Sequence, residues 1–167
     1  MTIATDNDLP TAEFWAFSVT LYGNESVKEQ MLRWQDENGA NVNLVLLCIW
    51  AGTLGRNLST DDIRRATGKV ASWNAAVTRP LRHLRQRLKS DWRQLANDAE
   101  PARQAILSAE LEAEKAEQEL LLKALAPWLA QTAADASTLI KANLAAYLGS
   151  AATAAPASSI AAICSGE

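Results

Sequence analysis

One nearly continuous apolar run, "VNLVLLCIWAGTLG", constrains the fold of this chain more than any other segment. Asn41 precedes it and can cap the first turn of a helix, and a glycine closes it, as is common where helices end. A helix that is apolar on nearly all sides must be surrounded by other parts of the protein. The length of the run and its flanking residues favour a helix over a buried strand. We therefore predict a central, most buried helix at Val42–Leu54.

The remaining sequence predicts further helices with recognisable ends. In "AEFWAFSVTLY" the apolar residues recur at helical spacing, and Gly23 ends the pattern. Between Val70 and Trp92 an apolar stripe keeps its phase across Pro80, which favours one kinked helix over two separate ones. A second helix is expected to start at a capping box of Ser26 and Glu29. Three further helices are expected at Ser59–Gly68, Pro101–Ala126 and Ser137–Leu148. No segment shows sustained strand alternation, so the predicted fold is all-α, a single-domain bundle of six or seven helices.

The two ends of the chain differ in composition from this bundle. We expect residues 1–10 to form an N-terminal tail, residues 11–149 the helical domain, and residues 150–167 a disordered low-complexity tail rich in Ala and Ser. The two cysteines lie far apart in the sequence, which is typical of a protein in a reducing compartment. The longest apolar run is much shorter than the about 20 residues that span a bilayer, and the first residues do not resemble a signal peptide. We expect a cytoplasmic monomer without a membrane segment.

Charge is distributed unevenly along a chain whose formal net charge is −3. Residues 1–55 and 94–167 each sum to −5, whereas residues 56–93 sum to +7. The stretch "RPLRHLRQRLKSDWR" alone contains six basic residues and one acid. The two acidic flanks would repel phosphate beyond this local patch, which makes nucleic acid the weakest candidate partner. An acidic protein segment or a small anion fits the patch better.

A later helix carries an acidic row that matches this basic stretch. At 100° per residue, the helix expected at Val70–Trp92 and its continuation carry one arc of bases: Arg79, Arg82, Arg85, Lys89 and Arg93. The helix expected at Pro101–Ala126 carries a row of acids: Glu110, Glu114 and Glu117. Antiparallel packing of the two apolar stripes would bring glutamates against arginines. Since five bases face three acids, we predict a divided row, in which part pairs within the protein and the rest is free for an anionic ligand or partner. Gln118 interrupts the apolar stripe of the second helix, and we predict that it faces the rest of the domain.

Few residues suggest chemistry. His83 is the only histidine and lies opposite the apolar stripe, and the sequence has no nucleophile, phosphate-binding or metal-binding motif. We therefore predict no catalytic residue, no metal ion and no cofactor, and we favour a non-enzymatic protein. Asn43, two residues inside the apolar helix, needs a hydrogen-bond partner, either a neighbouring helix end or a ligand amide. The candidate binding residues are Arg79, Arg82, Arg85, Lys89, Asn43 and Trp73.

Two functional interpretations follow from these residues. In the first, the chain is a non-enzymatic interaction module that docks a protein or a small anion through its Arg-rich helix. In the second, it is a small-ligand-binding protein or an enzyme with an internal pocket formed by Trp50, Trp73, Asn43 and the arginines. An interaction surface should leave the spare arginines on an open face with exposed aromatic residues. A pocket should draw Arg82 or Arg85 inward, towards Asn43.

Four sequence blocks occur together in this chain: "FWAFSVTLYG", "LRWQDENGANVNLVLLCIWAG", "WNAAVTRPLRHLRQRLK" and "AELEAEKAEQ". In this order they resemble a proteobacterial family of conserved proteins of about this length and of unknown function. The resemblance covers roughly residues 12–125, and the typical "LQ" of the family before "D" is "WQD" here. It implies a bacterial cytoplasmic helical protein and no particular activity.

Overall fold

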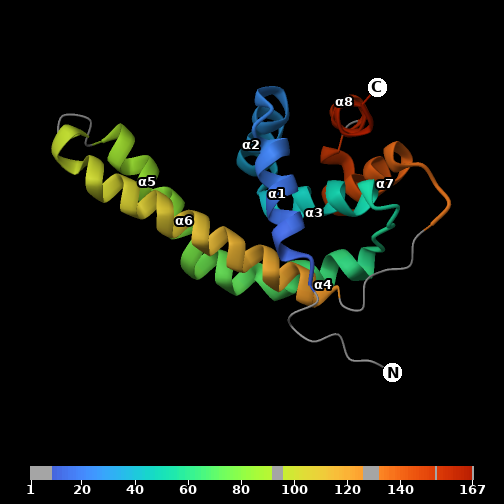
Figure 1. The fold of residues 1–167 in the computed structure, drawn as a ribbon, viewed down its shortest axis with the longest axis horizontal. Helices are drawn as coiled ribbons and strands as arrows, with labels where there is room; N and C mark the ends of the chain where they lie inside the picture. The colour runs from blue at the N-terminus through green and yellow to red at the C-terminus, as the bar shows by residue number, and fades with distance from the viewer. Residues whose placement is uncertain (1–8, 92–95, 126–131, 153, 167) are drawn as a thin grey trace.

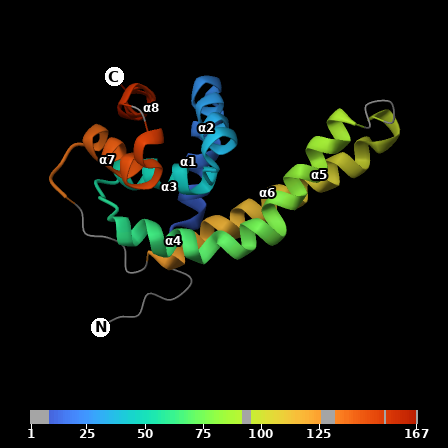
Figure 2. The same cartoon turned by 180° about the vertical axis from the view of Figure 1, so that it is seen from behind.

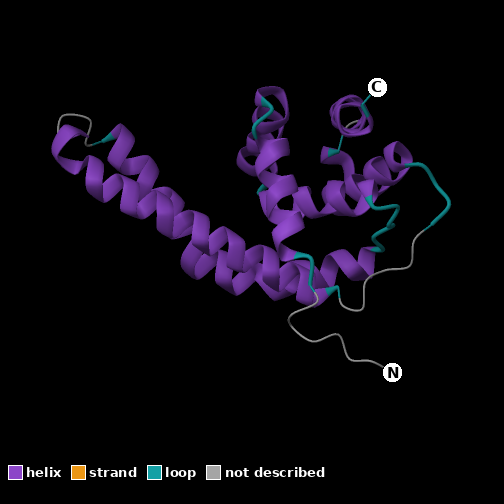
Figure 3. Cartoon of the chain, in the orientation of Figure 1, coloured by secondary structure: helices purple, strands orange, loops and turns teal. Residues whose placement is uncertain are grey.

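The computed structural model describes residues 9–91, 96–125, 132–152 and 154–166, and every regular element in these ranges is a helix (Figure 3). The elements are α1 (Thr11–Tyr22), α2 (Glu25–Asn38), α3 (Val42–Thr53), α4 (Thr60–Trp73), η2 (Asn74–Thr78), α5 (Arg79–Ser90), α6 (Ala96–Ala124), α7 (Ala136–Leu148), η4 (Gly149–Ala151) and α8 (Ala154–Ser165). Because α4, η2 and α5 follow one another without a break, the described chain forms seven long helical rods. The predicted all-α bundle of six or seven helices is confirmed, while most of the predicted N-terminal tail lies outside the described residues.

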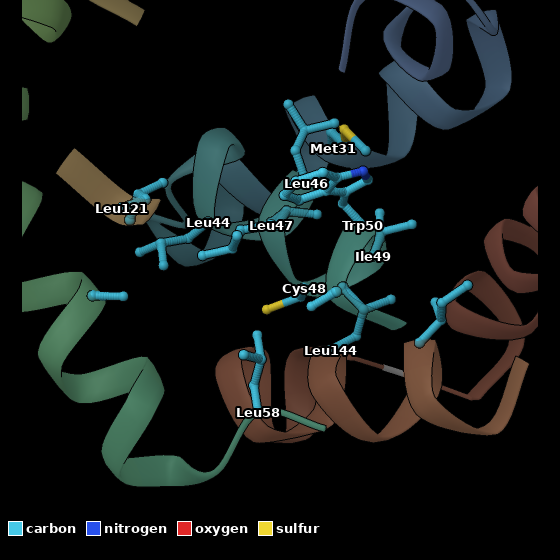
Figure 4. Packing of buried hydrophobic residues seen from close by; sticks show 14 of the residues in the cluster. Met31, Leu44, Leu46, Leu47, Cys48, Ile49, Trp50, Leu58, Leu121 and Leu144 are labelled. Carbon is cyan, nitrogen blue, oxygen red and sulfur yellow. The ribbon is translucent and has the colours of Figure 1, made fainter. Parts of the chain in front are cut away.

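α3 lies at the centre of the core, as its apolar sequence predicts. All of its residues from Asn43 to Gly52 are buried, and α1, α2, α6 and α7 pack around it. Figure 4 shows the leucines of α3 in one cluster with Met31 of α2 and Leu144 of α7. Full burial of a Leu or Ile side chain stabilises a fold by about 1.5–3 kcal/mol. α3 therefore contributes a large share of the apolar stabilisation.

A close approach of α7 fixes the C-terminal half of α3. At Gly52 an added Cβ would lie 2.6 Å from Ile140 Cγ1 and 2.7 Å from the Ile140 backbone nitrogen. Asn143 of α7 donates to the backbone oxygens of Cys48 and Arg56, each at 3.0 Å. The missing side chain at Gly52 thus lets the two helices meet, and Asn143 satisfies backbone oxygens that the contact buries.

α4 and α5 form one continuous rod through the π-helical segment η2. The sequence predicts a helix end at Gly68, which is wrong, because α4 runs through this residue to Trp73. The predicted kink at Pro80 takes the form of a wider π turn directly before α5. A proline inside an α-helix clashes with the carbonyl group four residues earlier, and the additional residue of a π turn relieves this contact.

α5 and the part of α6 beside it project from the body as an antiparallel hairpin (Figures 1 and 2). We call this hairpin, residues 79–90 and 96–114, the arm. α6 begins at Ala96, so the predicted start at Pro101 is wrong. Pro101 lies inside α6, where it removes one backbone hydrogen bond and crowds the preceding turn, a local cost that a helix of this length tolerates. The predicted end at Ala126 lies outside the described residues.

Polar side chains cap several of the other helices. Asn41 accepts from the backbone nitrogen of Leu44 at 3.2 Å, and a capping box of Ser59 and Asp62 forms at the start of α4. The capping box predicted for α2 is wrong, because Asn24 caps that helix and Ser26 donates to the Asn24 side chain at 2.8 Å. Asn24 lies closer to the end of α1, so the connection between the two helices is shorter than predicted.

The C-terminal segment is folded where its composition predicts disorder. The sequence predicts a disordered tail at residues 150–167, whereas α8 spans most of that segment. Ala157, Ile160 and Ala161 are buried in the core cluster, and α8 packs against α7. Each small side chain buries little area, but small side chains also let two helices approach closely. α7 supplies contacts that cannot be predicted from the composition of this segment.

Candidate functional site

The basic helix and the acidic row meet at Arg82, where α5, α6 and α2 come together. Arg82 donates from Nε to Glu110 Oε1 at 3.1 Å, from Nη2 to Glu114 Oε1 at 2.6 Å and from Nη1 to Gln35 Oε1 at 2.6 Å. Arg85 donates to both oxygens of the Glu110 carboxylate. We call these five side chains the Arg82 cluster. Its geometry confirms that glutamates of α6 pair with arginines of α5.

Burial and charge pairing act in opposite directions within the Arg82 cluster. The side chains of Arg82 and Glu110 are 19% and 4% exposed. Burial alone would lower the pKa of Arg82, but the charge of Glu114 and the hydrogen bonds to Glu114 and Glu110 raise it. Burial raises the pKa of Glu114, and the charge of Arg82 offsets part of that shift. Two cations and two carboxylates therefore neutralise one another, and the cluster presents little net charge to a ligand.

Glu117, the third acid of the row, binds no arginine among the described residues. It is fully buried and accepts hydrogen bonds from Asn41 Nδ2, from Asn74 Nδ2 at 3.2 and 3.3 Å, and from Thr78 Oγ1 at 2.8 Å. Asn74 and Thr78 are the first and last residues of η2. The prediction that Glu117 pairs with the basic row is wrong, because η2 turns amide and hydroxyl groups towards it. Its carboxylate instead joins the cap of α3 to the π turn.

The remaining bases of the row confirm that it is divided. Arg79 and Lys89 are exposed and form no ion pair with a described residue. Arg87 pairs with Asp91 at 3.3 Å on the surface of the arm, and Arg93 lies outside the described residues. The basic helix thus gives two arginines to the Arg82 cluster and leaves Arg79 and Lys89 at the surface without an ion pair to a described residue.

Two cavities adjoin the Arg82 cluster. The polar cavity, of about 400 Å³, lies between the α2–α3 turn and the start of α5, and its wall includes Asn41, Asn74, Glu117, Arg79 and His83. The mixed cavity, of about 550 Å³, lies between the α1–α2 pair and the arm, and its wall includes Trp15, Val19, Tyr22, Leu107, Leu111 and Arg85. Arg82 and Asn43 contribute to both walls. Four of the six predicted binding residues, Arg79, Arg82, Arg85 and Asn43, therefore line one cavity or the other.

The inner wall of the mixed cavity is polar. Gln118 is 2% exposed, and its Nε2 donates to Ser18 Oγ and to Asn43 Oδ1, each at 3.0 Å. This confirms that Gln118 faces the domain. It also gives Asn43 the partner that its burial requires, although this partner is a side chain of α6 rather than a helix end.

The tryptophans of the predicted pocket lie elsewhere. Trp73 donates from Nε1 to the backbone oxygen of Ala113 at 3.0 Å and so joins α4 to α6. Trp50 stacks on Phe14 in the core, with ring centroids 4.8 Å apart. Neither tryptophan lines the two cavities. Trp15 of α1 supplies the indole ring at the mixed cavity instead.

Sequence reasoning missed the part of the site that α1 contributes. Ser18 lies on the stripe of buried residues of α1, between Phe14 and Leu21. A hydroxyl group on an otherwise apolar stripe needs a partner, as Gln118 does on its own stripe. These two interruptions are the signal that could have predicted their contact.

Within the described ranges, no three side chains of His, Cys, Asp or Glu gather where they could hold a metal ion. None of the helices there combines the length and the apolar character that crossing a membrane requires. His83 is exposed and lines the polar cavity.

Comparison with known proteins places both cavities within the part of the chain that one family model matches. A family model described as "Protein of unknown function (DUF2390)" matches residues 13–121, well over half of the chain. The chain belongs to this family. The DUF2390 match includes every residue of both cavity walls, whereas α7 and α8 lie beyond it. No curated protein and no solved structure matches the chain. The description of the DUF2390 family assigns no function.

Proposed function

We propose that the protein binds a small organic ligand in the mixed cavity, as a binding protein rather than an enzyme. The observation that carries this proposal is the inward position of Arg82, which lines the mixed cavity together with Asn43. This is the arrangement that an internal pocket requires, whereas an open interaction surface requires exposed aromatic side chains. The large apolar side chains that are exposed among the described residues are Val19, Leu54, Leu84, Leu111 and Ile163, none of which is aromatic.

The walls of the mixed cavity support the binding of an organic molecule. Its volume of about 550 Å³ falls within the range typical of small-molecule sites, roughly 300–1,000 Å³. Apolar side chains of α1 and α6 form its sides, and polar groups of α1, α3 and α6 form its inner wall. The charged side chains at its edge bind one another, as in the Arg82 cluster and in the pair of Lys28 with Glu25 at 3.3 Å. Paired charges favour binding over acid–base catalysis.

Native mass spectrometry tests this proposal on the full chain purified gently from its own cells. We expect a small molecule to accompany the protein. Leu111→Trp should remove it by filling the cavity, because Leu111 lines the wall and is 40% exposed. Ile163→Trp is the matched control, since Ile163 is 42% exposed on α8, outside the cavity. Equal occupancy in the two variants would contradict the proposal.

A second function, docking of an acidic protein partner, is favoured by the surface cations of the arm. Arg79 and Lys89 are exposed without an ion pair to a described residue, and the arm projects from the body (Figure 1). An affinity pull-down would compare a variant carrying Arg79→Ala and Lys89→Ala with one carrying Arg33→Ala and Lys69→Ala. The control residues are also exposed but lie on α2 and α4. A partner lost only from the first variant would support docking at the arm.

We infer that the chain acts as a monomer in a reducing, cytoplasmic environment. The two cysteines are free thiols, and burial raises the pKa of Cys48, which disfavours the reactive thiolate. Light scattering would test the monomer, and fractionation of the native cells would test the location.

A further inference from the structure

The neighbours of Gln118 fix the orientation of its amide group. Ser18 Oγ donates its proton to the backbone oxygen of Phe14 at 2.8 Å, so towards Gln118 it can only accept. The Oδ1 atom of Asn43 is also an acceptor. Both contacts therefore need the amide nitrogen of Gln118, which donates one hydrogen to each at 3.0 Å. The amide oxygen has to point elsewhere.

The Oε1 atom of Gln118 is a buried acceptor with no hydrogen-bond partner among the described residues. Buried amide oxygens in native proteins nearly always accept at least one hydrogen bond, and one that does not is costly. Gln118 forms part of the wall of the mixed cavity. Neighbouring atoms cover the oxygen itself, so a molecule that enters this cavity with an N–H or O–H group supplies the donor after a small rotation of the amide towards it.

The other walls indicate what the rest of such a molecule resembles. Trp15, Tyr22, Leu107 and Leu111 present ring and alkyl surfaces to the cavity. The nearby charges of Arg82 and Arg85 are matched by those of Glu110 and Glu114. A charged ligand would lose its hydration without gaining a free counter-charge, whereas an uncharged apolar body would not meet this penalty.

We propose that Gln118 Oε1 is the recognition group of the mixed cavity, which takes a neutral, flat, mainly apolar molecule with one N–H or O–H donor. This rests on the ligand-binding function proposed above and adds the class of ligand. Ser18 and Asn43 act as positioning residues, because they hold the nitrogen end of the Gln118 amide and so aim its oxygen end.

A pair of probes that differ only in the donor tests the proposal. Indole is a flat bicyclic molecule with one N–H group, and benzothiophene has nearly the same shape with sulfur in that place. Each would be titrated into the isotopically labelled full chain and followed by NMR. We expect indole to bind about five- to tenfold more tightly, the effect of one neutral hydrogen bond. Indole, and not benzothiophene, should also shift the side-chain amide signal of Gln118 in the unaltered protein.

Two substitutions on α6 separate recognition from general effects. Gln118→Met keeps the length of the side chain but removes the acceptor, so the ratio of the two affinities should fall to about one. Gln104→Met is the control, because Gln104 is exposed, bonds to Glu100 and does not line the cavity. It should keep the preference for indole. The shift of the Gln118 signal remains a valid readout if Gln118→Met does not fold.

Each outcome decides a different point. A preference for indole that Gln118→Met abolishes supports the proposal. Equal binding of the two probes at the cavity would overturn the role of Gln118, for example because an internal water molecule supplies the donor, and would leave the ligand-binding function intact. Absence of binding by either probe would overturn the proposed ligand class. The ligand-binding function itself falls only if native mass spectrometry also finds no cavity-dependent ligand.

Discussion

The core around α3 and the junction of the arm with the body are both built from helices, but different forces hold them. α3 is enclosed by apolar side chains on all sides, with Asn143 and Gln118 as local polar contacts. α5, in contrast, has no buried residue, and it meets the body through the Arg82 cluster. Apolar packing depends mainly on volume and tolerates many partners, whereas a buried polar contact depends on particular atoms. The core should therefore be most sensitive to added volume, and the junction to changed polarity.

The largest expected effect comes from adding one methyl group where α3 meets α7. The Cβ of Gly52→Ala would lie 2.7 Å and 2.9 Å from backbone atoms of Ile140, and a backbone cannot move aside as a side chain can. We expect the free energy of unfolding to fall by about 3 kcal/mol, as for other overpacked cores. Urea denaturation measures it.

Gly68→Ala is the matched control for this change. No atom lies within 4 Å of its added Cβ, and alanine favours a helix over glycine by roughly 0.8–1.0 kcal/mol. The two identical substitutions should thus act in opposite directions. If both destabilise the protein to the same degree, the close contact between α3 and α7 is wrong.

The second prediction concerns the junction. Arg82→Met should lower the free energy of unfolding by about 2 kcal/mol, because it leaves the buried Glu110 and the half-buried Glu114 side by side with fewer counter-charges. Arg87→Met removes an exposed pair, whose side chains are 59% and 53% exposed, and should change stability by less than about 0.5 kcal/mol. Denaturant midpoints compare the two. An equal effect would mean that Arg82 is no more important than a surface arginine.

A smaller effect is expected at the buried carboxylate next to the π turn. Glu117→Gln keeps the size of the side chain but replaces an acceptor oxygen by a donor opposite Asn74 and Thr78. We expect a loss of about 1.5 kcal/mol, typical of a hydrogen bond to a charged group. Amide hydrogen exchange should increase mainly in η2.

Glu119→Gln provides the control for Glu117 on the same helix. The Glu119 side chain is 49% exposed and pairs with Lys123, so its loss should be within about 0.5 kcal/mol. Faster exchange in η2 of this control as well would show that the effect is not specific to Glu117.

The smallest predicted effect is a difference in pH response between the start of α4 and the junction of the arm. At Asp62 burial would raise the pKa, but the hydrogen bonds with Ser59 and the charge of Arg65 lower it overall. A carboxyl group whose pKa is lower in the folded state stabilises the fold above its unfolded pKa, and this contribution disappears as the pH falls through the folded value. Acidification below about pH 4 should therefore weaken the start of α4 by about 0.5–1 kcal/mol, the usual value of a helix cap.

Glu114 in the arm should respond with the opposite sign. Burial raises its pKa, so its ionised form disfavours the folded state, and this penalty is lost as the pH falls through the raised pKa towards the unfolded value. Stability measured against pH for Asp62→Asn and Glu114→Gln tests the pair. The first variant should lose less stability on acidification than the unaltered protein, and the second should lose more.

Much of the fold could be predicted because its signals are local. The capping groups of Asn41 and of Ser59 with Asp62 act within one helical turn, and the apolar run of α3 has a single reasonable environment. The predictions failed where contact with a distant segment determines whether a helix forms or continues. α4 continues through Gly68 because Ala66 and Val70 on either side are buried, and α8 forms because α7 offers it a surface.

The site was predictable only in outline. Charge spacing correctly predicts that arginines of α5 meet glutamates of α6 and that some cations stay at the surface. Charge spacing could not predict that Glu117 binds η2, because the π turn before Pro80 changes which side chains face α6. The hydrogen bond between Ser18 and Gln118 could not be predicted either, since the two residues lie a hundred positions apart in the chain.

By itself, then, the sequence determined most of the helical segments up to α7, which helix is central and that arginines of α5 oppose glutamates of α6, since periodicity and apolar content are properties of each segment alone. Only the tertiary structure decided the partner of each buried polar group. Asn43 and Ser18 meet Gln118, and Glu117 meets η2. A hydrogen bond requires two groups within about 3 Å in a definite orientation. The way two helices cross brings such groups together, and the residue pattern of one helix does not specify that crossing.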